Sequence, residues 1–227
     1  MALTVFFVIM TVAAYLLSRY LYFRYNNPLI NIVLLSAAAI IAILVLAKIP
    51  YQAYVPAKDI MTFLLGPATV ALAVPLYRNR HLLKQYGIAI FMGVGIGTLI
   101  SMATVMFITR AGGLTREIIV SIIPKSSTIP IAVDVAQLAG GNSALAVAFV
   151  VATGTFGSVI GLTLLSWFKI YDPVARGLAM GTVSHGQGTA MALLEGEKQG
   201  SMAGVAMSLA GVFTSVLAPI LIACFVD

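Results

Sequence analysis

Five stretches of the sequence contain no Lys, Arg, Asp, Glu or His, and each is long enough to cross a lipid bilayer as an α-helix. They cover residues 1–18, 29–47, 87–109, 143–168 and 201–226. A spanning helix needs about 20 apolar residues. Only 9% of the 227 residues are charged, whereas a soluble domain carries roughly 25%. The sequence therefore predicts an all-α integral membrane protein rather than a water-soluble domain.

Three further apolar stretches are interrupted by residues that weaken a helix. They are residues 60–77 with Gly66-Pro67, 118–138 with Pro124, and 177–194 with a Gly-rich run around His185. Proline removes a backbone donor, and loosened backbone in hydrocarbon must be buried in protein or line a wet cavity. We therefore expect about seven or eight spans, with discontinuous helices inside the bundle. The chain is expected to form one transmembrane domain, 1–227, with outer or scaffold helices in 1–48 and a repeat-containing core in 60–226.

The three interrupted stretches resemble one another. Thr69, Thr128 and Thr189 recur about every sixty residues, and an Ala-rich segment follows each of them. Internal repeats on this scale are common in transporters, whose binding sites lie at discontinuous helices between the repeats. Parallel and inverted copies both fit the spacing. If every stretch spans, the loop Lys and Arg residues divide six to six between the two sides, so the positive-inside rule predicts no orientation.

Lys125 is a candidate for binding an anion within the membrane. It is followed by Ser126, Ser127 and Thr128, and a Ser/Thr cluster before a helix is typical of an N-cap. Free N–H groups and the helix dipole attract anions at such a position, and Lys125 adds a full positive charge. The pattern favours a carboxylate site. The alternative is a lysine whose side chain extends to the membrane interface.

Asp134 and His185 are the other two ionisable side chains at the expected membrane depth, where such groups are costly and usually functional. His185 lies in the Gly-rich run with Gln187 and Thr189. It is a candidate for binding a carboxylate or for titrating during transport, and a buried structural histidine is the alternative. Asp134 is about 13 Å from Lys125 if the helix is continuous. It either couples protons or sodium, or marks the polar end of its helix.

An enzyme is not expected. Ser184 and His185 are adjacent in the sequence, and adjacent residues rarely orient as nucleophile and base. One cysteine, Cys224, and two histidines do not supply a zinc site, so we expect neither a metal nor a cofactor. The net charge of +6 comes from basic residues beside apolar stretches, where they meet lipid head groups. We therefore expect no nucleic-acid binding.

The interrupted stretches also resemble those of a known family. The sequences GPATVALAVPLY (66–77), IIPKSSTIPIAVDV (122–135) and ARGLAMGTVSHGQGTAMALLEGE (175–197) are similar to the LrgB/CidB family of bacterial membrane proteins, and the likeness covers nearly the whole chain. The resemblance implies two functions. One is partnership with holin-like LrgA/CidA proteins in the control of murein hydrolase activity and cell lysis. The other is transport of small carboxylates, since a plant relative is a plastid glycolate/glycerate translocator.

The family motifs point to contacts at Lys125, Thr128, His185 and Thr189. Two positions depart from the family pattern. Gln187 stands where relatives usually carry an apolar residue, and Ser127 stands where many have threonine. The resemblance therefore leaves the exact substrate open.

We predict a secondary transporter of small monocarboxylates, such as pyruvate, lactate or glycolate, in the bacterial cytoplasmic membrane. The predicted substrate-binding residues are Lys125, Ser126, Ser127, Thr128, His185, Gln187, Thr189 and Thr69, and Asp134 is the candidate for ion coupling. The alternative is a non-transporting regulator of a holin-like partner that controls murein hydrolase activity and cell lysis. We expect a homo-oligomer, and an LrgA/CidA-like membrane protein is a candidate partner.

Overall fold

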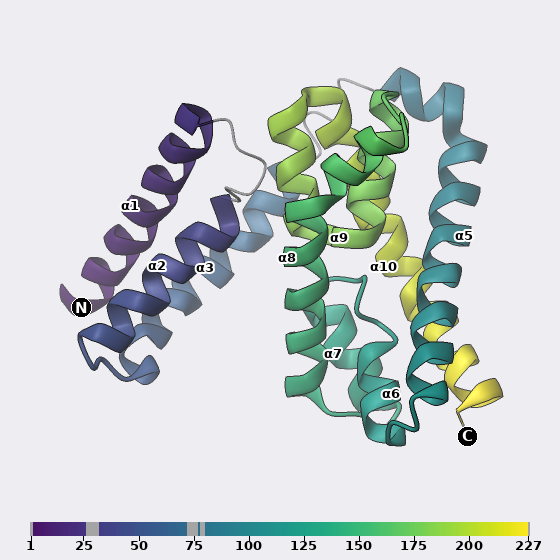
Figure 1. The fold of residues 1–227 in the computed structure, drawn as a ribbon, viewed down its shortest axis with the longest axis horizontal. Coiled ribbons are helices and arrows are strands. Elements are labelled where there is room, and N and C mark those ends of the chain that lie inside the picture. The colour runs from purple at the N-terminus through teal and green to yellow at the C-terminus, as the bar shows by residue number, and fades with distance from the viewer. Residues whose placement is uncertain (1, 26–31, 72–76, 78–79, 227) are drawn as a thin grey trace. The chain divides into compact units, whose positions relative to one another are not determined.

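The computed structural model describes residues 2–25, 32–71, 77 and 80–226. That part of the chain contains helices and no strand (Figure 1). Four of its helices are long and apolar enough to cross a membrane, namely α1 (Ala2–Tyr25), α5 (Arg80–Ala111), α8 (Ser143–Trp167) and α10 (Glu197–Phe225). The predicted class, an all-α membrane protein with several spans, is confirmed.

The chain divides into two compact units, Met1–Ala73 and Val74–Asp227. The first contains α1, α2 (Ile32–Leu46) and α3 (Tyr51–Ala71). Its core includes Phe7, whose ring meets that of Tyr54 edge to face with centroids 5.7 Å apart. Thr11 Oγ1 lies 2.9 Å from the Tyr54 hydroxyl, so α1 and α3 are joined by both an aromatic pair and a hydrogen bond.

The predicted helix break at Gly66-Pro67 is wrong, because α3 continues through both residues to Ala71. A proline removes one backbone donor, and a membrane helix tolerates this loss when other groups satisfy the freed carbonyl. The side chain of Thr69 lies outside the described residues. The first interrupted stretch therefore differs from the other two, in which the helix does break.

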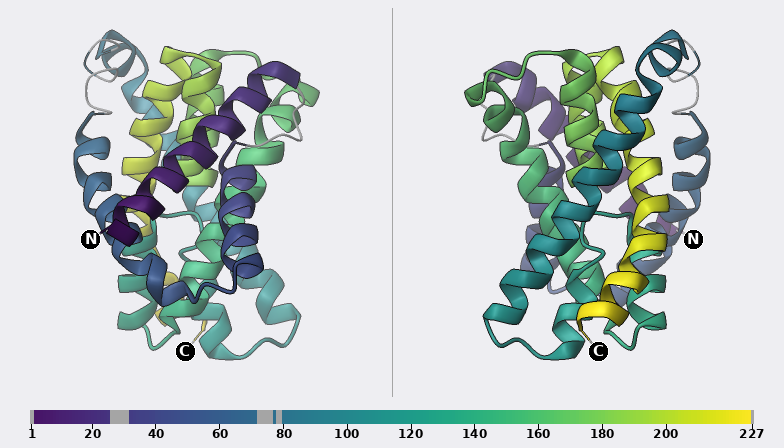
Figure 2. Two further views of the ribbon diagram at one scale, coloured as in Figure 1. Left: turned by 90° about the vertical axis from the view of Figure 1, so that its left-hand side faces the viewer. Right: turned by 90° about the vertical axis from the view of Figure 1, so that its right-hand side faces the viewer.

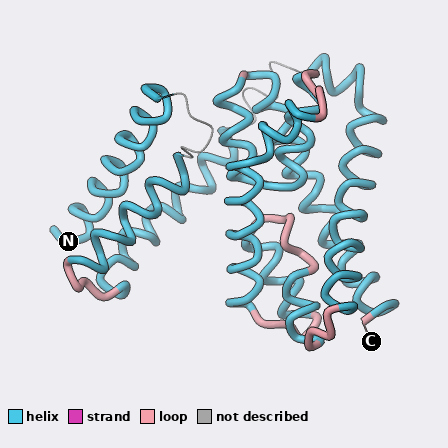
Figure 3. The backbone as a smooth tube through the Cα atoms, viewed as in Figure 1, coloured by secondary structure: helices cyan, strands magenta, loops and turns pink. Residues whose placement is uncertain are grey.

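The stretch 118–138 folds as a helical hairpin. α6 (Arg116–Ile122) and α7 (Ile129–Leu138) are joined by a tip, residues 123–128, which Figure 3 draws as a loop in the middle of the second unit. At the base of the hairpin, Arg116 Nη1 donates to the carbonyl of Ala139 at 3.0 Å. The chain thus enters the unit and returns to the same end, and the predicted break after Pro124 is confirmed.

α9 (Pro173–Glu195) is a second hairpin. His185 has φ 40° and ψ −125°, which separates two half-helices. Arg176 Nε donates to Glu195 Oε2 at 2.9 Å although the two residues are 19 positions apart. On a straight helix that separation would be roughly 28 Å. His185 therefore lies at the tip of a hairpin whose base is closed by Arg176 and Glu195, which confirms the predicted break in this stretch.

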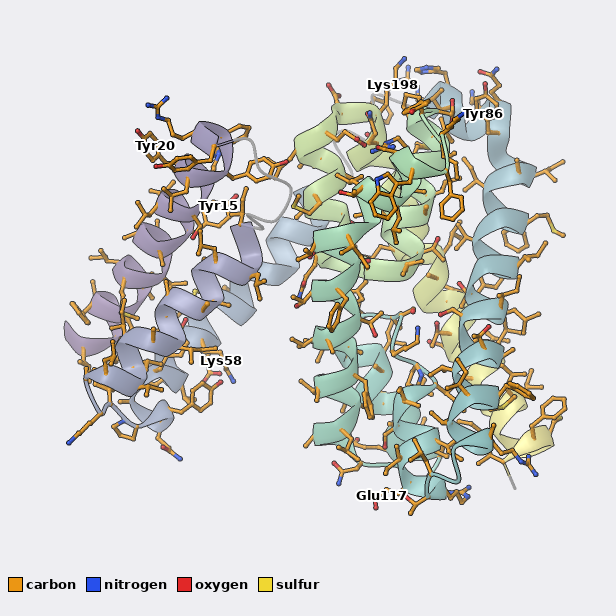
Figure 4. All side chains as sticks on the ribbon, viewed as in Figure 1. Tyr15, Tyr20, Lys58, Tyr86, Glu117 and Lys198 are labelled. Atoms are coloured by element: carbon orange, nitrogen blue, oxygen red, sulfur yellow. The ribbon has the colours of Figure 1, made fainter. Side chains whose placement is uncertain are left out.

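The two hairpins enter the second unit from opposite ends (Figures 1 and 2). α8 connects these ends. At its start, Asn142 Nδ2 donates to Glu117 Oε1 of α6 at 3.1 Å, and near its other end Ser166 Oγ accepts from Arg176 of α9 at 3.2 Å. Figure 4 shows Glu117 at one end of the unit and Lys198 at the other. α5 with α6–α7, and α8 with α9, therefore run in opposite directions across the unit, which is the orientation expected for inverted rather than parallel repeats.

With this topology the positive charges of the second unit divide unequally between its two ends. Among its described residues, and leaving aside Lys125 at a tip, one end carries Arg80, Lys84, Lys169, Arg176 and Lys198, whereas the other carries Arg110 and Arg116. We name these the basic end and the opposite end. The positive-inside rule predicts that the basic end faces the cytoplasm. The α9 hairpin then enters from the cytoplasmic side and the α6–α7 hairpin from the outside.

Labelling from one side of the membrane tests this orientation. We expect an impermeant maleimide, added to intact cells, to label Leu114→Cys and Leu138→Cys at the opposite end, and to leave Tyr86→Cys and Tyr171→Cys unlabelled until the cells are lysed. All four side chains are exposed, and the substitutions leave every Lys and Arg in place. A Cys224→Ser background is needed because Cys224 is exposed. Labelling of the Tyr86 and Tyr171 variants alone would mean the reverse orientation.

Candidate functional site

The tip of the α6–α7 hairpin holds Lys125 in a triangle of polar atoms. Pro124 has no backbone N–H and ends the hydrogen-bond ladder of α6, while Pro130 is tolerated in the first turn of α7. Lys125 Nζ donates to Ser101 Oγ of α5 and to Ser126 Oγ, each at 3.1 Å. The two hydroxyl oxygens are themselves 3.1 Å apart. The hairpin tip is thus fastened to α5 through the lysine ammonium group.

The charge of Lys125 has no counter-ion within the described part of the chain. Lys58 pairs with Asp59 and Arg176 with Glu195, and Lys125 belongs to neither pair. The two serine hydroxyls accept hydrogen bonds but carry no negative charge. Removing a charge from water without a partner of opposite sign is unfavourable. A bound anion would therefore stabilise this tip.

The tip of the α9 hairpin packs against glycine positions of α8. His185 Nε2 donates to the carbonyl of Val150 of α8 at 3.1 Å. A Cβ atom placed on Gly154 would lie 2.6 Å from the His185 ring, and one on Gly157 would lie 1.7 Å from Ser184 Oγ. Both distances are shorter than van der Waals contact, so only glycine permits this approach. These glycines therefore allow the α9 hairpin to pack closely against α8.

α5 contacts both hairpins within about one helical turn. Gly97 faces the α9 hairpin, since its Cβ position lies 3.5 Å from Thr182 Cγ2. Ser101, four residues further along α5, binds Lys125 of the α6–α7 hairpin. Four residues of α-helix correspond to a rise of about 6 Å. The two tips therefore lie at nearly the same level of α5.

The contacts of α10 independently indicate that the two tips lie at a similar level. Met207 Sδ lies 3.9 Å from Thr189 Oγ1 of α9, whereas the Cβ position of Gly211 lies 2.8 Å from Ile131 Cδ1 of α7 and 4.0 Å from Ser127 Oγ. Met207 and Gly211 are again four residues, or about 6 Å, apart. Two spanning helices thus place the tips of opposed hairpins at one depth in the unit.

A groove along α8 also reaches both tips. Its walls are mainly apolar side chains of α8 and of the first half of α9, including Phe149, Phe156 and Val183. Ile122, which directly precedes the first tip, and Ser184, which precedes His185, belong to the same lining. The groove therefore runs past residues adjacent to both tips.

Four buried polar atoms of the described residues have no hydrogen-bond partner. They are Thr98 Oγ1, Ser127 Oγ, Ser184 Oγ and Gln187 Oε1. Ser127 belongs to the first tip, Ser184 and Gln187 flank His185, and Thr98 precedes Ser101 by three residues on α5. Buried polar groups are nearly always paired, and each unpaired group costs about 1–3 kcal/mol. Their concentration around the tips indicates a place for a polar ligand.

The remaining predicted residues lie in different surroundings. Thr128 is the N-cap of α7, and its side chain makes no cap hydrogen bond. Thr189 Oγ1 donates to the carbonyl of His185 at 2.8 Å, a bond within the α9 hairpin. Asp134 is exposed on α7, beyond the first turn of that helix. Of these three side chains, that of Thr128 lies at a tip.

Sequence reasoning did not select Thr98 and Ser101 of α5. Both lie in the stretch 87–109, which reads as a plain apolar span. Their spacing is the available signal, since residues at i and i+3 share a helix face. That signal alone does not say whether the shared face meets lipid or a hairpin.

Membrane-length helices around two opposed hairpins, with polar tips at one depth, define the chain as a polytopic membrane protein with discontinuous helices at its centre. The LrgB-like family matches residues 11–224. The chain is 34% identical to the uncharacterized protein YxaC of Bacillus subtilis over 98% of this chain and 97% of that protein. It is 34% identical to the holin-like protein CidB of Staphylococcus epidermidis, over 97% and 96% of the two chains, and 33% identical to that of Staphylococcus aureus, over 96% and 95%. The chain belongs to the LrgB-like family, and no solved structure matches it.

Backbone packing of the α9 hairpin gives a prediction of stability. A Cβ atom on Gly181 would lie 2.1 Å from the carbonyl oxygen of Ala203 of α10. We expect Gly181→Ala to lower the free energy of unfolding by about 1–3 kcal/mol, because backbone atoms cannot rotate away from the methyl group. Gly93→Ala on α5, where nothing lies within 4 Å, is the matched control and should be neutral or slightly stabilising. Equal melting temperatures of the two purified variants in detergent would contradict this packing.

Proposed function

We propose that the chain is a secondary transporter of small monocarboxylates and that the two hairpin tips form its substrate site. The observation that carries the proposal is Lys125, a positive charge without a carboxylate partner among the described residues, held by two serines at a tip surrounded by unpaired polar atoms. A charge at the centre of a bilayer costs at least a few kcal/mol on insertion scales. A substrate carboxylate would neutralise it.

The two half-helices that begin at the tips add to the attraction for an anion. α7 begins at Ile129 after the N-cap Thr128, and the second half of α9 begins after His185. The first N–H groups of a helix have no intrahelical partner, and the dipole makes that end positive. Both N-terminal ends belong to the tips. The proposed carboxylate position is therefore between Lys125 and these N–H groups.

The unpaired atoms favour a substrate with a second polar group. Ser127 Oγ, Ser184 Oγ and Thr98 Oγ1 can each donate or accept, and Gln187 Oε1 accepts only. An oxo group would accept from a hydroxyl, and a substrate hydroxyl could also donate to Gln187. The rise of about 6 Å on α5 between its contacts with the two hairpins suits a molecule of a few heavy atoms. Pyruvate, lactate and glycolate meet both conditions.

Opposed hairpins also suit alternating access. In inverted-repeat transporters the site lies between the repeats, and movement of one repeat against the other opens it to either side. A hairpin from each end of the unit supplies the two halves of such a site. Asp134 stays a candidate for ion coupling as an exposed carboxylate of α7. A homo-oligomer in the cytoplasmic membrane stays part of the proposal.

The second candidate function rests on the relatives. Two of them carry the name holin-like protein CidB, so a non-transporting regulator of a holin-like membrane partner, acting on murein hydrolase activity and cell lysis, is the alternative. A regulator needs contacts with its partner rather than polar atoms at the hairpin tips. Substitution of Lys125 therefore separates the two functions.

Uptake by vesicles containing the purified protein tests the transport function. We expect Lys125→Ala to weaken the apparent affinity for pyruvate, lactate or glycolate about ten- to a hundred-fold, because a hydrogen bond to a charged group is lost. Lys125→Arg should also impair uptake, since a guanidinium is planar and larger than an ammonium. Lys169→Ala, at the basic end, is the matched control. Uptake unchanged by both Lys125→Ala and His185→Ala would remove the proposed site and favour the regulatory function.

Ser101→Ala tests the part of the site that sequence reasoning missed. We expect a loss of apparent affinity of about two- to ten-fold, or about 0.5–1.5 kcal/mol, because Lys125 Nζ loses one of its two acceptors and is held less firmly for the substrate, while its charge remains. Ser208→Ala is the matched control, since Ser208 is an exposed residue of α10 whose hydroxyl bonds to its own helix. Equal uptake kinetics of the two variants would exclude Ser101 from the site.

A further inference from the structure

The base of the α9 hairpin is closed by Arg176, whose guanidinium group uses all its donors. Nε donates to Glu195 Oε2 at 2.9 Å, and Nη2 donates to Glu195 Oε1 and to the carbonyl of Leu162. Nη1 donates to Ser166 Oγ at 3.2 Å and to the carbonyl of Ile170 at 2.8 Å. A guanidinium has five N–H donors, and these five bonds employ every nitrogen. Arg176 is 6% exposed, so the bonds are shielded from water.

Arg176 joins three parts of the chain. It belongs to the first half of α9, and Glu195 ends the second half. Leu162 and Ser166 lie near the end of α8, and Ile170 lies in the turn that follows it. The bidentate pair with Glu195 prevents the half-helices from separating at the base. The three bonds to the end of α8 prevent the hairpin from sliding along that helix. Arg176 thereby fixes both the shape and the position of α9.

Glycines fix the rest of α9 against neighbouring backbone. A Cβ atom on Gly177 would lie 2.3 Å from the carbonyl oxygen of Gln199, and one on Gly188 would lie 2.2 Å from that of Met180. The first contact joins α9 to α10 and the second joins the two half-helices. Contacts of this kind have no side chains that can change rotamer. The hairpin that carries His185 and Gln187 is therefore held rigidly by α8 and α10.

The contacts of the α6–α7 hairpin with α5 and α10 are made through side chains instead. Gly211 of α10 meets the terminal Cδ1 atom of Ile131, and the tip is bound to α5 through the Lys125 ammonium group. At the base, the bond from Arg116 to the carbonyl of Ala139 is exposed. Side chains can change rotamer and ammonium groups can change acceptors while the backbone moves. The contacts of this hairpin with α5 and α10 can therefore change without a clash between backbone atoms.

We propose that Arg176 is a positioning residue that holds the His185 hairpin as a fixed wall of the carboxylate site, so that access to the site changes by movement of the α6–α7 hairpin. The statement that hairpin movement controls access to the carboxylate site rests on the proposed transport function. The difference in mobility between the two hairpins is independent of any substrate. Lys125 travels with the moving hairpin, whereas Arg176 acts on the site only through α9.

Hydrogen exchange of the purified protein in lipid nanodiscs tests the proposal. Without added carboxylate, the amides of 123–128 should exchange about ten-fold or more faster than those of 184–189. Pyruvate, lactate or glycolate should slow exchange at 123–128 and leave 184–189 unchanged. Arg176→Lys keeps the charge but supplies three donors instead of five, so exchange at 184–189 should rise about ten-fold. Arg116→Lys at the base of the other hairpin is the matched control and should leave 184–189 unchanged.

The outcomes separate this proposal from the transport function. Faster exchange at 184–189 than at 123–128 in the unsubstituted protein would overturn it, whatever the behaviour of the Arg176 variant. Unchanged exchange at 184–189 in Arg176→Lys would remove the role of Arg176. The predicted exchange pattern without carboxylate uptake would retain the fixed and moving hairpins and reject transport. Carboxylate uptake by a protein whose two hairpins exchange equally fast would retain transport and reject the fixed and moving hairpins.

Discussion

Peptide groups at the two helix breaks need partners or shielding inside a membrane, and the arrangement of the second unit follows from that need. Lipid offers no hydrogen bonds, so non-helical backbone survives at depth only where protein or a wet site surrounds it. The tip 123–128 and the tip at His185 are enclosed by α5, α8 and α10. Entering from opposite ends allows the two tips to share one enclosure. The three long helices therefore shield the peptide groups of the two helix breaks from lipid as well as spanning the bilayer.

Two cationic side chains of this unit, buried Arg176 and half-buried Lys125, have contrasting surroundings. Arg176 has a carboxylate partner, and its five donors are all engaged within the protein. Lys125 has two neutral acceptors and no ion pair among the described residues. Arginine suits a fixed, bidentate geometry, whereas a lysine ammonium changes partners readily. Arg176 is thus saturated by partners within the protein, whereas the charge of Lys125 has no partner of opposite sign among the described residues, as the proposed carboxylate site requires.

Much of the fold follows from the sequence, and the reasons for the exceptions are physical. Uncharged stretches predicted the membrane class, and proline or glycine beside Lys125 and His185 predicted two of the breaks. Proline at Pro67 predicted a third break that α3 does not have, because one lost donor does not end a membrane helix. Re-entry was not predictable, since it depends on a contact between Arg176 and Glu195 that spans 19 residues.

The candidate site was predictable in its charged members and not in its neutral ones. A charge in an apolar stretch is costly wherever it points, so Lys125 and His185 were selected from sequence. A hydroxyl in a membrane helix is not costly in the same way, because it can bond to its own backbone, as Thr109 Oγ1 does with the carbonyl of Val105 at 2.7 Å. Thr98 makes no such bond. What distinguishes Thr98 from Thr109 is therefore the tertiary packing around each side chain, which is known only once the chain has folded.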